Sequence, residues 1–474
     1  MNNWESIIPF LIIIPIAIWT KQVLPGLTLG LLVASYIVEP SLLGGIEKMT
    51  SYIIGSLAKE PKLQIIGFLY VFTGLVNMIN MTGGIKGFIE LTSEKVKTEK
   101  QAIFLIWITL LGTFISPSLR IVTIAPIMKQ LQQKLNITKE RVSFVIEASS
   151  LPIIALVPIA TAFIGYMTST IDVSLGNNSE DVNAYAYFIK SIPFNFFSFL
   201  TIALALIYSI FQHPKMFGGG KNKPGKVNVD NKKESTDKQE KATTEKGTDI
   251  KSKPIHLFIP LTLALVLSIF LSWWDGYQKT ANVLQAFIEA DVSKYMLIAI
   301  IITLFLAFVQ FLIAKYPLQE LVKAFFDGGN KLMPAFFLFA LVWGLTLATN
   351  DLGLPKFITN TLGFIPSLFI PPITFIIGSV LAYFIGSSWG SWGLLMPIGV
   401  SLAESSDISL SLMIGIIFAC GTLGGLISPL SNTTVTIAKI MEMEIMEYSV
   451  YKIKHTIVPF VLSIALYLVY ALVF

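Results

Sequence analysis

From Pro371 to Ser401 the chain reads PPITFIIGSVLAYFIGSSWGSWGLLMPIGVS, and this stretch decides the fold. Both of its ends are apolar, whereas its middle, Gly386-Ser387-Ser388-Trp389-Gly390, is rich in serine and glycine. The core of a bilayer has no water to satisfy peptide groups, so irregular backbone at that depth must face protein or a wet cavity. The stretch therefore predicts a re-entrant hairpin whose tip lines a solvated site.

A stretch in the N-terminal half has the same plan. The apolar residues from Ala102 to Ile127 are interrupted at Ser116-Pro117-Ser118, and basic loops on both sides place both ends in the cytoplasm. Ser116 precedes Pro126 by the same interval that separates Ser387 from Pro397. The C-terminal hairpin, which lies between Asp351 and the acidic Glu404 and Asp407, is expected to enter from the opposite side.

Each hairpin is followed by a second interruption rich in serine and proline. These are Ser149-Ser150-Leu151-Pro152 and Ser428-Pro429-Leu430-Ser431-Asn432. Two halves of opposite orientation, each with a hairpin and a broken helix, are typical of an inverted-repeat transporter. A competing match of Ile115-Ser116-Pro117 with Ile427-Ser428-Pro429 leaves the register open, and such residues also recur in membrane helices without any repeat.

The composition places the chain in the bilayer. Of 474 residues, 54% are hydrophobic and only 13% are charged, and the mean hydropathy is +0.72. A crossing needs about 20 apolar residues, so we expect an all-α, multi-pass protein of the cell membrane with about ten to twelve transmembrane helices. The net charge is +5, and the lysines are concentrated in loops between the spans, where the positive-inside rule places them. The basic charge therefore indicates the orientation of the chain in the membrane and argues against a nucleic-acid partner.

A polar segment divides the chain into two halves. Residues 213–254 are rich in lysine and nearly free of apolar side chains, which predicts a disordered cytoplasmic linker between transmembrane halves 1–212 and 255–474. The linker is an inert tether or, alternatively, a contact for lipid headgroups. The run Ile7 to Trp19 is expected to be a retained first span, and Phe188 to Phe211 a further span. A homodimer is one option for the assembly.

The small polar residues at the interruptions are the neutral candidates for binding an ion or a small molecule. They are Ser116, Ser118, Ser149, Ser150, Ser387, Ser388, Ser391, Ser428, Ser431, Asn432, Thr433 and Thr434, with Trp389 as a wall of the pocket. Their oxygens are hard ligands of the kind that Na⁺ prefers, and Ser388, Asn432 and Thr433 are the candidates for a Na⁺ site. The alternatives are close helix packing and hydroxyls that bond to their own helix.

Three charged residues are expected at or near membrane depth, where a charge is costly and therefore suggests function. Glu147 is a candidate carboxylate for a proton or a cation, or else a surface residue. Arg120 follows the first interruption and is expected to pair with Glu147, to hold a substrate carboxylate, or to reach the surface. Asp351 is a cation ligand or, preferably, an interfacial residue.

The sequence argues against an enzyme. The histidines His213, His256 and His455 are far apart, and no HExxH, GxSxG or GxxxxGK[ST] arrangement is present. The single cysteine, Cys420, excludes an intrachain disulfide. No catalytic residue, firm metal site or cofactor is expected.

The sequence resembles the NhaC-type Na⁺/H⁺ antiporter family, within the larger ion transporter superfamily. The resemblance extends over most of the chain outside the linker. Its motifs are Thr82-Gly83-Gly84, the segment from Lys134 through Ile146-Glu147-Ala148-Ser149-Ser150-Leu151-Pro152 to Ile159, Ser388-Trp389-Gly390 through Pro397, and Ser428 through Thr434.

This chain departs from the family at several acidic positions. The usual acidic pair of the first hairpin corresponds to Ser116 and Pro117, the Asp-His before the second Ser-Pro break corresponds to Gly425 and Leu426, and a further Asp corresponds to Asn432. Glu147 retains a carboxylate where the family commonly has Asp.

Three functional hypotheses follow. The first is a secondary active transporter, Na⁺/H⁺ antiporter-like or cation-coupled, in which Glu147 titrates while Ser387, Ser388, Asn432 and Thr433 coordinate the passenger. The second retains this fold but transports an amino acid or organic acid held by Arg120, because the binding cavity is mostly neutral. The third is a membrane scaffold or sensor without transport.

Overall fold

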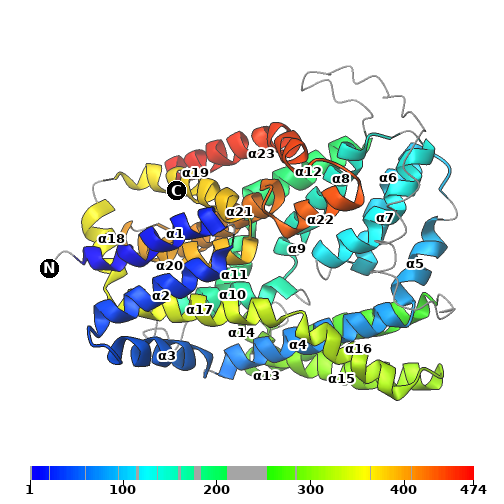
Figure 1. Ribbon diagram of the computed structural model, residues 1–474, viewed down its shortest axis with the longest axis horizontal. Coiled ribbons are helices and arrows are strands. Elements are labelled where there is room, and N and C mark those ends of the chain that lie inside the picture. Colours follow the sequence, from blue (N-terminus) through cyan, green and yellow to red (C-terminus); the bar gives the residue numbers. More distant parts are fainter. Residues whose placement is uncertain are drawn as a thin grey trace.

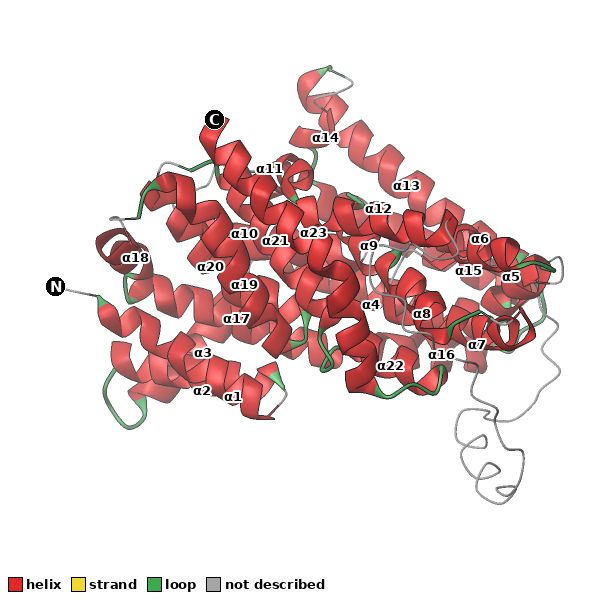
Figure 2. Cartoon of the chain, turned by 90° about the horizontal axis from the view of Figure 1, so that it is seen from above, coloured by secondary structure: helices red, strands yellow, loops and turns green. Residues whose placement is uncertain are grey.

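The computed structural model describes residues 3–20, 22–58, 60–93, 96–113, 117–135, 137–158, 162–175, 183–210, 253–282, 286–362, 365–406 and 408–473. Within these ranges the chain consists of helices joined by loops and turns, without a β-strand (Figure 2). Seven of the described helices are long and apolar enough to cross a membrane, and one bent pair makes an eighth. The all-α, multi-pass class is confirmed; the apolar helices Trp4–Thr20 and Val23–Val38 are shorter than this criterion requires and are not among the seven.

The helices form two repeats with matching order. The first begins with α1 (Ile8–Thr20), α2 (Val23–Val38), α3 (Gly44–Leu57), α4 (Glu60–Met81) and α5 (Gly84–Ser93), and the second with α13 (Ile255–Thr280), α15 (Val292–Ile313), α16 (Leu318–Asn330), α17 (Met333–Asp351) and α18 (Leu354–Leu362). A short helix, α14 (Ala286–Glu289), joins α13 to α15.

Packing between the repeats is reciprocal. Helix α4 packs against α15 and α16 of the other repeat, and α17 packs against α2 and α3. In Figure 1, α4 leads to α5 at the right end and α17 leads to α18 at the left end, so the two helices run in opposite directions. Both turns require glycine, because Gly83 after α4 and Gly353 after α17 have φ angles of 71° and 80°.

Two helical hairpins stand at opposite ends of the molecule (Figure 1). The first consists of α6 (Glu99–Thr113) and α7 (Pro117–Leu135), and the second of α19 (Ile370–Ile385) and α20 (Ser388–Ser406). Both turns coincide with the predicted interruptions, although residues 114–116, which include Ser116, lie outside the described residues. At the second tip Gly386 has a φ of 66°, a conformation that favours glycine.

A broken helix follows each hairpin, in the register expected from the proline spacing. In the first repeat α8 (Lys139–Ala148) stops before Ser149, and α9 (Leu151–Leu156) and α10 (Ala162–Leu175) continue the chain. In the second repeat α21 (Leu410–Ile427) stops before Ser428 and α22 (Asn432–Ile440) resumes. The competing register is wrong, because it would match a hairpin turn with a helix break.

The last helices of each repeat are α12 (Phe196–Ile210) and α23 (Ile445–Val473). The expected span from Phe188 to Phe211 corresponds to a bent pair, in which α11 (Ala184–Ser191) and the short 3-10 helix Ile192–Phe194 meet α12 at 50°. Pro193 lacks the N–H that a continuous helix would use here. Residues 211–252, which include most of the predicted linker 213–254, lie outside the described residues.

Candidate functional site

The second hairpin tip meets both helix breaks at one point. A side-chain carbon at Gly386 would lie 2.6 Å from Cβ of Leu430, in the second break. A side-chain carbon at Gly425 would lie 2.0 Å from Oγ of Ser388, at the hairpin tip, and 2.8 Å from Cδ2 of Leu151, in the first break. The absence of side chains at these glycines allows the three irregular segments to converge.

A fully buried ion pair lies beside this convergence. The Lys452 ammonium of α23 is 3.0 Å from Oε2 of Glu147 on α8, and it donates a hydrogen bond of 2.5 Å to Oγ1 of Thr434 on α22. The Tyr448 hydroxyl donates to the same Glu147 oxygen at 2.6 Å. Glu147 is 2% exposed and Lys452 is 0% exposed. The carboxylate of the first repeat is therefore held by the last two helices of the second.

This pair explains how two charges are accommodated inside an apolar fold. An isolated charge at bilayer depth costs at least about 2.5 to 3.5 kcal/mol on insertion scales, whereas a paired carboxylate and ammonium carry no net charge. The Lys452 ammonium also contacts Glu147 and Thr434 together, so it occupies the position that a small cation bound by these two oxygens would take. The Lys452 ammonium is therefore stabilised by oxygens from both repeats.

Arg120 is buried on the other side of the first break. It is 0% exposed, and its Nη2 donates to the carbonyl oxygen of Ile106 at 2.7 Å and to Oγ of Ser149 at 2.9 Å. Among the described residues, its Nε and Nη1 have no hydrogen-bond partner. Of the interactions expected for Arg120, the pairing with Glu147 is absent, because Glu147 is bound by Lys452 instead.

Most of the predicted hydroxyl groups form hydrogen bonds with nearby groups of the hairpin tip and the helix breaks. Ser431 and Thr433 share a hydrogen bond of 2.9 Å, and Thr433 also donates to the Gly425 carbonyl at 3.4 Å. Ser428 accepts from the Leu430 N–H at 3.1 Å, Ser387 accepts from the Gly390 N–H at 3.2 Å, and Ser391 donates to the Ser387 carbonyl at 2.8 Å. Ser149 and Ser150 each bond back to a carbonyl of α8. Ser118 and Asn432 are exposed.

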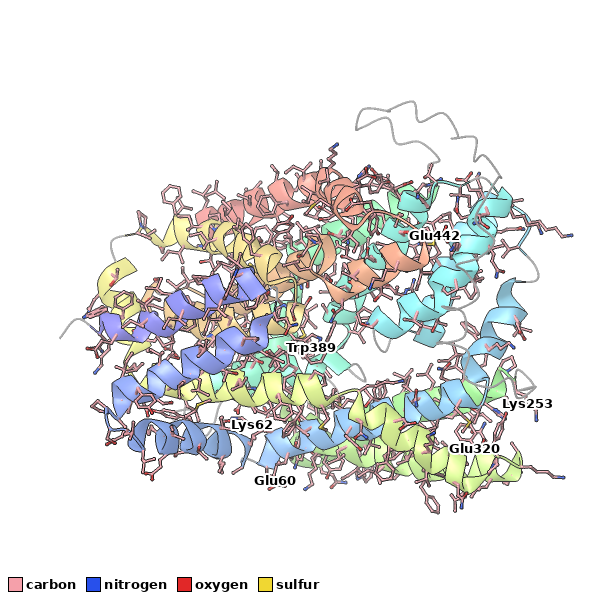
Figure 3. The ribbon with its side chains drawn as sticks, in the orientation of Figure 1. Glu60, Lys62, Lys253, Glu320, Trp389 and Glu442 are labelled. Atoms are coloured by element: carbon pink, nitrogen blue, oxygen red, sulfur yellow. The ribbon has the colours of Figure 1, made fainter. Side chains whose placement is uncertain are left out.

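The second hairpin tip is enclosed by aromatic side chains. The Trp389 ring lies 4.9 Å from Phe163, 5.0 Å from Tyr166 and 5.3 Å from Phe339, measured between ring centroids. The Tyr166 hydroxyl donates to the Trp389 carbonyl at 2.7 Å. Figure 3 shows Trp389 near the middle of the molecule. These contacts join α20 to α10 and α17, so Trp389 packs between elements of the two repeats.

Asp351 lies away from the breaks. It accepts a hydrogen bond of 2.7 Å from the Tyr52 hydroxyl of α3 and is exposed. The structure therefore places it at the end of α17, among the helices that open the first repeat.

A second link between the repeats joins α7 and α8 to Glu442, which follows α22. Lys129 of α7 bonds to the Glu442 carboxylate at 2.7 Å, and Lys139 of α8 donates to the Glu442 carbonyl at 2.8 Å. Figure 3 shows Glu442 beside the first hairpin. The hydrogen bond from Lys129 lowers the pKa of Glu442, with further contributions from the charges of Lys129 and Lys139.

The described residues contain no group of three His, Cys, Asp or Glu side chains suited to a transition metal. A pocket of about 300 Å³ lies between α4, α10, α11 and α13 to α15, where Lys62, Asp172 and Glu289 contribute to its lining. None of the predicted site residues lines this pocket.

Sequence reasoning missed Lys452 and Tyr448. A signal was present, because Lys452 lies on the apolar helix α23 and a charge within a membrane helix suggests function. Its position near the start of the helix resembles that of a loop lysine, and only the packing of α23 against α8 and α22 shows that it is buried.

Comparisons with known proteins agree with this architecture. The chain is 20% identical to an uncharacterized protein of Haemophilus influenzae over 448 residues, which is 91% of this chain and 83% of the relative. It is 27% identical over 175 residues to an uncharacterized Na⁺/H⁺ antiporter of the same organism, covering 36% of this chain and 37% of that one.

Two solved structures share the fold. The YdaH transporter of Alcanivorax borkumensis superposes with a TM-score of 0.60 at 15% identity, covering 90% of this chain and 88% of the other. MtrF of Neisseria gonorrhoeae, described as one of a class of antimetabolite efflux pumps, superposes with a TM-score of 0.63 at 12% identity, covering 90% and 84%.

The family model for Na⁺/H⁺ antiporters matches residues 160–474, which include both arms of the second hairpin, the second break and Lys452. The resemblance noted in the sequence is confirmed. The chain is a multi-pass, cation-coupled secondary transporter that belongs to the Na⁺/H⁺ antiporter family.

Proposed function

We propose that this transporter exchanges Na⁺ for a proton at the Glu147–Lys452 pair. The observation that supports the proposal is the position of the Lys452 ammonium, which contacts Oε2 of Glu147 at 3.0 Å and Oγ1 of Thr434 at 2.5 Å. Carboxylate and hydroxyl oxygens are ligands suited to a hard cation, so the ammonium occupies a cation position in this state.

The exchange balances in charge and atoms. An arriving Na⁺ takes the place of the ammonium against Glu147, and the displaced lysine is then a buried cation without a partner. Burial without a partner disfavours the charged form, so the lysine releases one proton and becomes neutral. When Na⁺ leaves on the other side, Lys452 takes up a proton there and pairs with Glu147 again. One Na⁺ crosses for one proton.

The breaks supply the movement that this cycle needs. The pair joins α8 of the first repeat to α22 and α23 of the second, so its separation removes one of the links that hold the repeats together. Alternating access follows from one repeat moving relative to the other.

The test uses purified protein in vesicles that contain a pH indicator. Wild-type vesicles respond to added Na⁺ with a change in internal pH, and Glu147→Gln removes this response. Lys452→Met retains Na⁺ binding, measured by thermal stabilisation, but loses the proton movement. Lys454→Met is the matched control, since Lys454 is exposed on the same helix. Normal Na⁺-driven proton movement in Lys452→Met would refute the proposal.

A further inference from the structure

Arg120 is a buried cation that the proposed exchange does not use. It has no exposed surface, and none of the ion pairs among the described residues includes it. Of its five N–H bonds, the two on Nη2 are directed to the Ile106 carbonyl and Ser149 Oγ, while those on Nε and Nη1 find no acceptor in the part of the chain that the structure describes. Buried donors without acceptors are rare in proteins, so this site calls for a ligand.

The chemistry of the missing partner is defined by two needs. The guanidinium is charged at every physiological pH, so the partner must be an anion. Its free N–H groups point from two different nitrogens, so the partner should offer more than one acceptor. A carboxylate has two oxygens with about four acceptor positions, whereas a halide ion is a single point of charge.

We propose that Arg120 binds the carboxylate of a small organic acid or amino acid that is transported together with Na⁺. This inference rests on the proposed exchange at Glu147 and names the second substrate of that cycle. The two sites share one break, because Ser149 bonds Arg120 and stands two positions after Glu147. A carboxylate beside Arg120 and a Na⁺ beside Glu147 leave together without net charge, which lowers the cost of crossing the bilayer.

The occluded position of Arg120 links binding to movement. Arg120 is on α7, the Ile106 carbonyl is on α6, and Ser149 follows α8, so the guanidinium ties both arms of the first hairpin to the first break. A carboxylate reaches the free nitrogens only when the hairpin moves away from α8. A ligand that binds the open form better than the closed form shifts the population toward it.

The test measures thermal unfolding of the purified full chain in detergent at constant ionic strength. The choline salts of lactate, succinate and glutamate are compared with choline chloride, and lactamide serves as the uncharged analogue of lactate. At least one carboxylate should raise the Tm in a concentration-dependent way, while chloride and lactamide do not. Equal stabilisation by chloride would overturn the proposal in favour of a halide site, and so would an effect of lactamide.

Variants separate this proposal from the Na⁺/H⁺ exchange. Arg120→Met should abolish the carboxylate effect and weaken binding by at least about tenfold, and Arg120→Lys, which keeps the charge, should weaken it less. Glu147→Gln should lose Na⁺-driven proton movement but keep carboxylate binding. A retained carboxylate effect in Arg120→Met would refute the anion site alone. If Arg120→Met does not fold, an unchanged carboxylate affinity in Arg120→Lys would count against the proposal.

Discussion

Replacing Lys452 with methionine tests the energetics of the buried pair. Methionine keeps the approximate length of the lysine stem but removes the ammonium, so the Glu147 carboxylate loses its contact of 3.0 Å and Thr434 loses a donor at 2.5 Å. Glu147 is 2% exposed, and water cannot replace the missing cation. Removing one partner of a buried pair costs about 3 to 5 kcal/mol, and we expect a loss of that size in the free energy of unfolding.

The double variant Glu147→Gln/Lys452→Met provides the decisive comparison. With both charges removed, no carboxylate is left unpaired, and replacing a whole buried pair with uncharged groups is often close to neutral. The double variant should therefore be more stable than Lys452→Met. The coupling energy from the double-mutant cycle should be at least about 2 kcal/mol, well above the roughly 0.3 to 0.5 kcal/mol scatter of independent sites.

The assay is reversible unfolding in mixed micelles at neutral pH, for wild type, both single variants, the double variant and Lys454→Met. The exposed Lys454 should change stability by less than about 0.5 kcal/mol. Additive effects of the two single changes, or a loss below about 1 kcal/mol in Lys452→Met, would show that the two charges do not interact as the structure places them.

Three further substitutions test other parts of the fold. Gly386→Ala should cost at least about 1 to 2 kcal/mol of stability, because the φ angle of Gly386 is 66°. Gly55→Ala is the control, because Gly55 has open space around it and its substitution should not destabilise the protein. Equal losses of stability in the two variants would contradict this prediction. Glu442→Gln should cost under about 1 kcal/mol, because the pair with Lys129 is partly exposed. The pKa of Glu442 is lowered in the folded state, so its pair with Lys129 stabilises the protein above the ordinary glutamate pKa of 4.5. This stabilisation is lost as the pH falls through the lower pKa of the folded state. Unfolding experiments at several pH values would show the loss. Asp351→Asn should keep Na⁺-driven proton movement in vesicles, and its loss would place Asp351 in the transport path.

The local pattern of the sequence predicted most of the architecture. Apolar runs interrupted at Ser116, Ser149, Ser387 and Ser428 mark positions where a membrane helix cannot remain regular, and three of these interruptions fall between described helices. The fourth, Ser116, lies outside the described residues. Such a signal is local, because Pro and Gly act on their own turn of helix. The bend before α12 was missed although Pro193 was present, because an apolar run alone was taken as one span.

What the sequence by itself determined was the class of protein, the order of its repeats, the helix breaks and the candidate carboxylate Glu147. Only the tertiary structure decided which charged side chains form a pair. Arg120 is closer to Glu147 in sequence, yet Lys452, 305 positions away, is its partner because α23 packs against α8 and α22. Coulomb energy depends on distance in space and on burial, neither of which is encoded at any single position of the chain.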